Sequence, residues 1–284
     1  MGFSLLSQEE LEHYGEKDYK DSDQYERFFR RRKLVGAWQI NQLKKGALVV
    51  RLKTNKTLIN TLLKNGNTLL AEKKRLETLA MNLNISKAYR NSYDFSKVYF
   101  IYSNSSDSLL NGARSNIFLD SNLSVDPSII MNEKFYLIAE RDYVYNSSIG
   151  FVPEDSARAQ IEGGNPTTQA GIVIKNKYGH QLKKPFPYNA YLVGVLKAIY
   201  YSIVVIDGKQ TTFNVENPFG IGSGEKIKYE YNGRPLTLNI SKDFTYEVYT
   251  LYVSNLNSNF HQFYQENRNP EGSKHFKDCK PFLY

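Results

Sequence analysis

Two short apolar runs, ALVVRLK (Ala47–Lys53) and KVYFIYS (Lys97–Ser103), decide the fold because of what lies between them. Both runs are rich in β-branched or aromatic residues and carry apolar residues on both faces, which is typical of buried strands. The residues between them predict a long helix, interrupted at NGN (Asn65–Asn67), with Thr54 or Asn55 as its N-cap. A strand, a helical crossover and a second strand predict a parallel βαβ unit.

The segment from Glu9 to about Lys45 predicts another helix, which Gly46 ends. The segment is highly charged and contains no proline. Positions 28 and 35, and positions 34 and 38, are spaced as residues on one face of a helix are. The apolar residues of this stripe are Phe28, Phe29, Leu34, Val35, Trp38 and Leu43. We expect residues 1–45 to form a helical N-terminal arm.

The chain after the second strand adds further strands. Asn116–Asp120 and Lys134–Asp142 are expected to be strands, and residues 143–170 read as a long loop. GIVIKNKYGHQLKKPFPY (Gly171–Tyr188) predicts a hairpin that turns at Lys177–Gly179. A connection as long as 143–170 is either functional or flexible.

Two more hairpins and a helix complete the prediction. Asp207–Gly208 and Asn232–Gly233 stand between alternating runs, which is a strong hairpin signal. Phe244–Asn267 predicts the last helix. The fold class is therefore α/β: a mixed sheet with a long helical crossover, an N-terminal helical arm, added β-hairpins and a C-terminal helix. We expect one α/β domain over 46–267, with the hairpins inserted at about 189–243, and a polar tail over 268–284.

Composition places the chain among folded proteins but indicates no partner. Of its 284 residues, 41% are hydrophobic and 23% are charged, and the formal net charge is +8. No apolar run approaches the roughly 18 residues that a membrane helix needs. The only cysteine is Cys279, so no intrachain disulfide or cysteine-based metal site can form.

The sequence motifs that resemble known binding sites lack residues that those sites require. GIGSGEK (Gly220–Lys226) resembles a phosphate loop, but Glu225 puts a carboxylate where phosphate would lie, and Ile227 follows where Ser or Thr is needed. The four histidines show neither HxxxH nor HExxH spacing, so they predict no local zinc site. We expect no nucleotide, no metal and no cofactor.

Carboxylates offer the alternative of an enzyme. Glu140 and Asp142 would point to one face of a strand, and Asp94 precedes another strand. A cleft covered by residues 143–170 could use them as a carboxylate-dependent hydrolase. Two of these groups within ~6 Å of each other would favour that hypothesis.

A binding function is the main expectation. Basic and aromatic residues interleave in RFFRRRK (Arg27–Lys33) and in KKPFPY (Lys183–Tyr188), and tyrosine-rich surfaces can contact partners. The residues expected to bind a protein partner are Phe28, Phe29, Arg30, Arg31, Arg32, Lys33, Trp38, Lys184, Phe186 and Tyr188. The same basic clusters leave nucleic-acid binding as a further alternative.

Three segments carry a family resemblance: DFSKVYFIYS (Asp94–Ser103), the hairpin that ends in PFPY, and VYTLYVSNLNSNFHQFY (Val248–Tyr264). They resemble an uncharacterised bacterial family of exported proteins with a VYFFY-type strand, a PFPY hairpin and a C-terminal aromatic helix. Residues 189–245 depart from that pattern. The order of elements also resembles thioredoxin-like folds, without their CxxC. The resemblance implies export but no activity.

The start of the chain, GFSLLSQ (Gly2–Gln8), bears on location. Its short apolar stretch before a polar segment predicts the end of a signal peptide over Phe3–Gln8, with cleavage before Gln8. We therefore expect a periplasmic or secreted protein, with the cytoplasm as the alternative. The hypothesis is a non-enzymatic exported binding or structural protein, part of or accessory to a cell-envelope or surface assembly.

Overall fold

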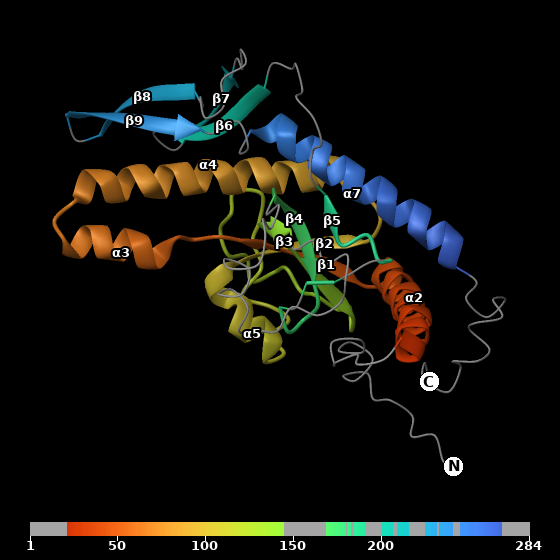
Figure 1. Cartoon of the computed structure of the whole chain (residues 1–284). Coiled ribbons are helices and arrows are strands. Elements are labelled where there is room, and N and C mark those ends of the chain that lie inside the picture. Colours follow the sequence, from red (N-terminus) through yellow and green to blue (C-terminus); the bar gives the residue numbers. More distant parts are fainter. Residues whose placement is uncertain are drawn as a thin grey trace.

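The computed structural model describes residues 22–144, 169–179, 181–182, 185–190, 200–206, 209–215, 225–231, 233–240 and 245–268. Within them the fold is α/β, with a five-stranded mixed sheet in the order β2-β1-β3-β4-β5 (Figure 1). Two separate two-stranded sheets, β6-β7 and β8-β9, complete the β structure of these residues.

The predicted βαβ unit is confirmed. β1 (Ala47–Leu52) is followed by α3 (Lys56–Lys64), α4 (Thr68–Ser92) and β2 (Lys97–Tyr102). β1 and β2 pair in parallel from Ala47↔Lys97 onward. The helical crossover breaks between α3 and α4, as the NGN sequence predicts, and Gly66 adopts a positive φ of 74° there.

β3 (Tyr136–Val144) lies on the other side of β1, again parallel to it. The chain therefore leaves β1 toward β2 and later returns to the opposite side of β1. β4 (Gln169–Lys175) pairs with β3 in the antiparallel direction, and the short β5 (Asn189–Ala190) pairs with β4. The carboxyl ends of β1 and β3 flank the point where the strand order reverses.

The predicted hairpin over 171–188 is only partly correct. The turn forms where expected, with Gly179 at a φ of 87°. Among its described residues, the second arm forms an isolated bridge between Lys175 and Gln181 and a backbone hydrogen bond from the Leu182 amide to the Ile174 carbonyl, and ladder pairing follows at β5. Pro185 and Pro187 explain the gap, because proline has no N–H to donate to a strand ladder.

The prediction of a strand over Asn116–Asp120 is wrong. These residues form only isolated bridges, Ile101↔Phe118 and Leu119↔Val125. They belong to an irregular segment that follows η1 (Ser103–Ser105) and α5 (Ser106–Leu110) and leads to β3. Asn116 and Leu123 take positive φ values of 62° within it, which a regular strand does not allow.

The later hairpins are confirmed. β6 (Tyr200–Ile206) pairs with β7 (Lys209–Val215), and β8 (Glu225–Tyr231) pairs with β9 (Arg234–Ile240). β6 and β9 contact α4 on the side away from the five-stranded sheet (Figure 1). The C-terminal helix α7 (Tyr246–Asn267) begins at Thr245, whose hydroxyl accepts a hydrogen bond from the Val248 amide.

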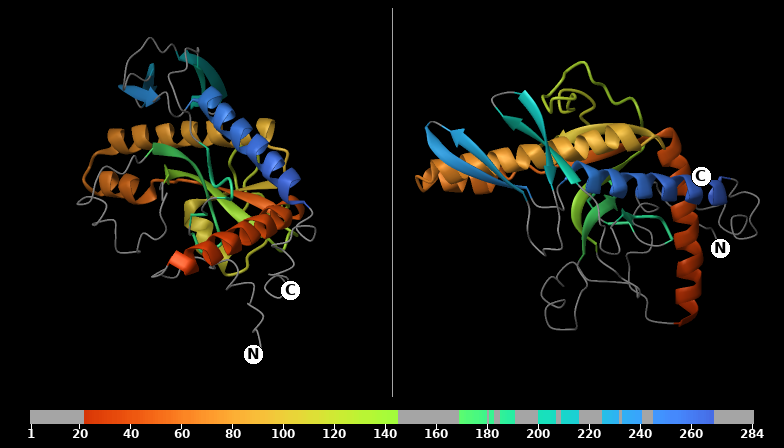
Figure 2. Two further views of the ribbon diagram at one scale, coloured as in Figure 1. Left: turned by 45° about the vertical axis from the view of Figure 1, so that its right-hand side comes forward. Right: turned by 90° about the horizontal axis from the view of Figure 1, so that it is seen from above.

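The two faces of the sheet are covered differently. α2 (Ser22–Lys45), α4 and α7 cover one face, which Leu48, Val50 and Leu52 of β1 contact in the main core. The irregular segment and α5 cover the other face, where Ala47 and Val49 belong to a smaller core. Figure 2 shows α7 and α4 crossing over the same side of the sheet.

The second half of α2 is part of the main core. Val35 and Ala37 are buried, and Ile40 and Leu43 are fully buried against the sheet. The expected boundary after residue 45 therefore does not separate this half of the helix from the domain, because its apolar stripe has the sheet as its partner. No helix among the described residues is long and apolar enough to cross a membrane.

Candidate functional site

The structure brings two of the three candidate carboxylates together. Glu140 and Asp142 lie on one face of β3, and both bond the ammonium group of Lys175 from β4. Asp142 Oδ2 lies 2.7 Å from Lys175 Nζ. Strand alternation places the two carboxylates on the same face, and the antiparallel pairing of β3 with β4 brings the lysine between them.

Arg51 completes this ion-pair cluster, which consists of Arg51, Glu140, Asp142 and Lys175. Arg51 stands opposite Glu140 in the β1–β3 register and bonds its carboxylate. The Nε atom of Arg51 donates to the Ser106 hydroxyl at 2.8 Å. The cluster lies near the carboxyl ends of β1 and β3, where ligands bind in many open α/β sheets.

The electrostatics of the cluster favour a structural role over acid–base chemistry. Glu140 is 4% exposed and bonds two cations, so it has little access to a substrate. Burial works against the charge of Lys175, yet its hydrogen bonds to Asp142 and Glu140 prevail and raise the pKa of Lys175. The cluster thus contains two basic and two acidic side chains.

Asp94 lies elsewhere. Its carboxylate contacts α7, where His261 Nε2 is 2.7 Å from Oδ1 and Asn257 Nδ2 donates to the same oxygen at 2.9 Å. The hydrogen bond with His261 is the main reason that the pKa of Asp94 is lowered, followed by the one from Asn257. Asp94 bonds α7, which covers the helical face of the sheet, whereas Glu140 and Asp142 point to the other face. The three predicted carboxylates therefore do not form one site.

Two residues expected to bind a partner belong to the core instead. Phe186 and Tyr188 are 2% and 5% exposed. The Phe186 ring packs edge-on against Phe260 and Phe263 of α7, with ring centroids 5.6 Å and 5.9 Å away. The prediction of a docking surface at Phe186 and Tyr188 is corrected accordingly: Phe186 is buried against α7, and Tyr188 is buried in the same main core.

The other predicted partner-binding residues divide into three groups. Trp38 is half-buried and packs edge-on against Phe135, with ring centroids 5.3 Å apart. Lys33 is exposed on α2. The side chains at positions 28–32 and residue Lys184 lie outside what the structure describes, as do most of the loop over 143–170 and Gly220–Gly224.

A surface that sequence reasoning missed lies on α3 and the start of α4. We call it the α3 surface and define it by Leu58, Leu63 and Leu70, which are 46%, 48% and 50% exposed. No residue of α3 is buried, although the helix is amphipathic. The sequence KTLINTLLK shows the apolar face, but burial of that face depends on neighbours that no local pattern reveals.

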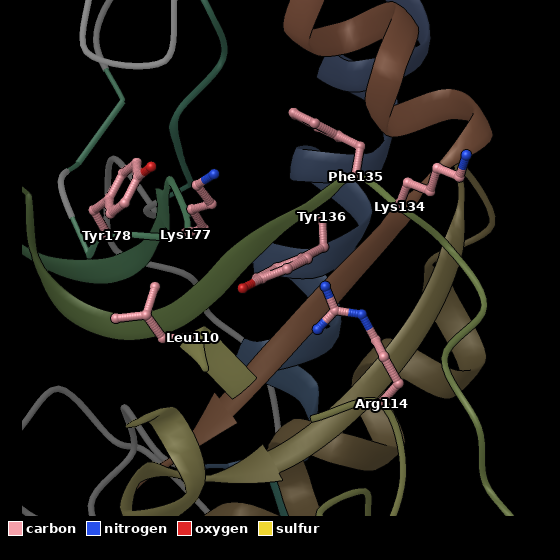
Figure 3. Close-up of a pocket in the computed structure, with 7 residues that line it drawn as sticks. All are labelled: Leu110, Arg114, Lys134, Phe135, Tyr136, Lys177 and Tyr178. Atoms are coloured by element: carbon pink, nitrogen blue, oxygen red, sulfur yellow. The ribbon is translucent and has the colours of Figure 1, made fainter. Parts of the chain in front are cut away.

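A pocket of about 240 Å³ lies between the irregular segment and the β3–β4 pair (Figure 3). It also escaped sequence reasoning, because its residues come from four separate stretches of the chain. Leu110, Arg114, Lys134, Phe135, Tyr136, Lys177 and Tyr178 line it. Three of these side chains are cationic, two are phenols and none is a carboxylate.

Among the described residues there is no group of three or more His, Cys, Asp or Glu side chains that could hold a metal ion. We also compared the chain with protein-family models, with curated proteins and with solved structures, and none of them matches it. The site must therefore be interpreted from its own geometry.

Proposed function

We propose that this chain is a non-enzymatic binding protein that docks a protein partner on the α3 surface. The observation that carries the proposal is the exposure of Leu58, Leu63 and Leu70, each about half exposed on elements that extend past the sheet (Figures 1 and 2). The three leucines lie on two consecutive helices, and exposed apolar patches mark interaction sites.

Helix geometry supports this interpretation. At 100° per residue, Leu58, Ile59, Leu62 and Leu63 span an arc of about 140° on α3. Ile59 and Leu62 lie in the middle of the arc and are half-buried, because α3 contacts α4. Leu58 and Leu63 lie at the two edges of the arc, where α4 leaves them open. One helix therefore covers only the middle of this apolar face.

Charge and composition suggest the chemistry of the partner. Residues 53–75 contain six basic residues and one acidic residue, which gives a net charge of +5. The acidic one, Glu72, is already bonded by Arg75 at 2.5 Å. The complementary surface is an apolar patch with an acidic rim. Residues 53–75 contain no aromatic residue, whereas helices that lie on membranes commonly use Trp or Phe, so a protein is favoured over a lipid surface.

The location of such a complex in the cell envelope stays a prediction. Glu140 and Asp142 do lie as close together as the hydrolase hypothesis requires, because both bond Lys175. Arg51 and Lys175 nevertheless engage these carboxylates, so the ion-pair cluster supports binding over hydrolysis. The basic character of residues 53–75 would also attract nucleic acid, and the experiment below therefore includes DNA as an outcome.

The test is a comparison of partner capture by three full-length chains: wild type, the double variant Leu58→Gln/Leu63→Gln, and Ile130→Gln as a matched control. Ile130 is 53% exposed but lies outside the α3 surface. Circular dichroism first checks that all three fold. A protein captured by the wild type and the control is then purified, and its affinity for each chain is measured.

We expect the double variant to bind that partner at least tenfold more weakly than wild type, which corresponds to the loss of more than ~1 kcal/mol on truncating a contact that matters. The control should bind as wild type does. Equal affinity for all three chains would overturn the proposal. The proposal would also be overturned if wild type binds phosphatidylserine vesicles or duplex DNA and the double variant does not. That result would assign the α3 surface to a different class of partner.

A further inference from the structure

The pocket between α5 and β3 is built around one arginine. Arg114 Nη1 donates to the carbonyl oxygens of Ala113 and Leu109, at 3.1 Å and 3.4 Å. The Arg114 carbonyl in turn accepts a hydrogen bond from the Met131 amide at 2.9 Å. The guanidinium lies over the Tyr136 ring, 5.5 Å from its centroid, as Figure 3 shows. Its position is therefore fixed by the protein before any ligand arrives.

The remaining donors of Arg114 have no hydrogen-bond partner among the described residues. Its hydrogen bonds to described residues all use Nη1, and none of its described partners is a carboxylate. A guanidinium presents a planar fork of donors that matches a carboxylate or phosphate group. Because only part of that fork is used by the two carbonyls, Nε and Nη2 can receive an oxyanion.

The other walls add positive charge and apolar surface. Lys177 Nζ lies 4.8 Å from the centroid of the Tyr178 ring, and Lys134 stands exposed at the rim with its ammonium directed away from Tyr136 (Figure 3). Lys134 makes no ion pair with the described residues. Leu110 and the two tyrosine rings provide apolar contact. The volume of about 240 Å³ is slightly below the usual range for ligand sites, which suits a small molecule.

We propose that this pocket binds a small organic anion, with its phosphate or carboxylate group on Arg114 and its apolar body against Tyr136, Tyr178 and Leu110. The site shares no residue with the α3 surface, so this proposal can be tested independently of the proposed docking. The charge of the lining decides the class of ligand: three cations with no carboxylate disfavour a cationic ligand and favour an anionic one.

The test uses isothermal titration calorimetry on the full chain with phenyl phosphate, benzoate, inorganic phosphate and the neutral benzyl alcohol. We expect phenyl phosphate or benzoate to bind and benzyl alcohol to bind at least tenfold more weakly. Affinity for the anions should fall as ionic strength rises, because the lining is partly open to solvent. Inorganic phosphate should bind more weakly than phenyl phosphate, since it leaves the apolar wall uncovered.

Variants then locate the site. Arg114→Gln should weaken anion binding by about ten- to hundredfold, as the loss of a charge-assisted hydrogen bond does. Arg114→Lys should recover only part of it, because a lysine has charge without the fork. Arg75→Gln removes an exposed arginine on α4 and should change nothing. Lys134→Gln, at an exposed position, should weaken binding slightly without any effect on folding.

Three results would overturn the proposal: no binding of either aromatic anion at millimolar concentration, equal binding of benzyl alcohol, or the same loss in Arg75→Gln as in Arg114→Gln. If Arg114→Gln does not fold, the ligand series on wild type and the Lys134→Gln variant still decide between an anion site and none.

Discussion

At the scale of single residues, Glu140 stands out as a buried charged residue of the described sheet. Its side chain is 3% exposed and lies between Arg51 and Lys175, whose side chains are 31% and 18% exposed. Removing a charge from water is costly, and only well-placed partners offset that cost. Arg51 and Lys175 are themselves partly buried, so Glu140 in turn offsets the cost of removing their charges from water.

We predict that Glu140→Gln lowers the free energy of unfolding by about 3 kcal/mol, because it leaves Arg51 without a carboxylate in the cluster and Lys175 with Asp142 alone. Urea denaturation followed by circular dichroism measures this. Asp142→Asn is the matched control: the Asp142 side chain is 28% exposed and bonds only Lys175 among the cluster, so its loss should be clearly smaller. An equal loss of unfolding free energy in the two variants would contradict the greater burial of Glu140.

At the scale of elements, the junction between α2 and β1 depends on a glycine. A Cβ at Gly46 would overlap the carbonyl oxygen of Phe135 and lie 2.9 Å from the carbonyl oxygen of Gln42. The Ala47 amide donates to the same Phe135 carbonyl at 3.1 Å, so the backbone cannot move aside without losing that bond. The residue that precedes β3 therefore packs closely against the junction between α2 and β1.

Gly46→Ala should therefore destabilise the protein by roughly 1–3 kcal/mol, the usual cost of overpacking. Gly36→Ala, inside α2, provides the comparison. Its added Cβ would meet Phe263 at 3.4 Å, an ordinary contact, and alanine has the higher helix propensity by about 1 kcal/mol. Thermal unfolding of the two variants should give a lower midpoint for Gly46→Ala and an unchanged or higher one for Gly36→Ala. The reverse order would contradict the described junction.

At the scale of the whole molecule, aromatic rings from distant parts of the chain meet around α7. Phe260 is fully buried, and its ring lies 5.5 Å from that of Phe95 and 5.6 Å from that of Phe186. Tyr93, at 6.3 Å, joins the same cluster. These contacts attach the C-terminal helix to the end of α4, to the start of β2 and to the segment before β5.

We predict that Phe260→Ala lowers the free energy of unfolding by about 3–5 kcal/mol, since it leaves a cavity at this junction. Phe263 lies three residues further along α7 and is only partly buried, so Phe263→Ala should lower the free energy of unfolding by less. Denaturation followed both by circular dichroism and by tyrosine fluorescence should give coincident transitions in wild type. Separate transitions would show that α7 and the sheet do not unfold together.

Local sequence patterns determined most of the elements. Apolar runs set β1, β2 and β3, the NGN break separated α3 from α4, and the two Gly-containing turns placed the later hairpins. These features are predictable because side-chain alternation, helical periodicity and turn conformation depend on residues that are neighbours in the chain. Alternation alone also placed Glu140 and Asp142 on one face of their strand.

Only the tertiary structure decided which of these residues are available. Phe186 and Tyr188 look like surface aromatics in sequence, yet both are buried in the main core, whereas Leu58 and Leu63 of α3 look like core residues and stay half exposed. Arg51 and Lys175 reach the carboxylates of β3 only through strand register, and Arg114 meets Tyr136 only after the irregular segment folds back on the sheet. Burial and charge pairing depend on contacts between distant segments, and local patterns do not encode which segments meet.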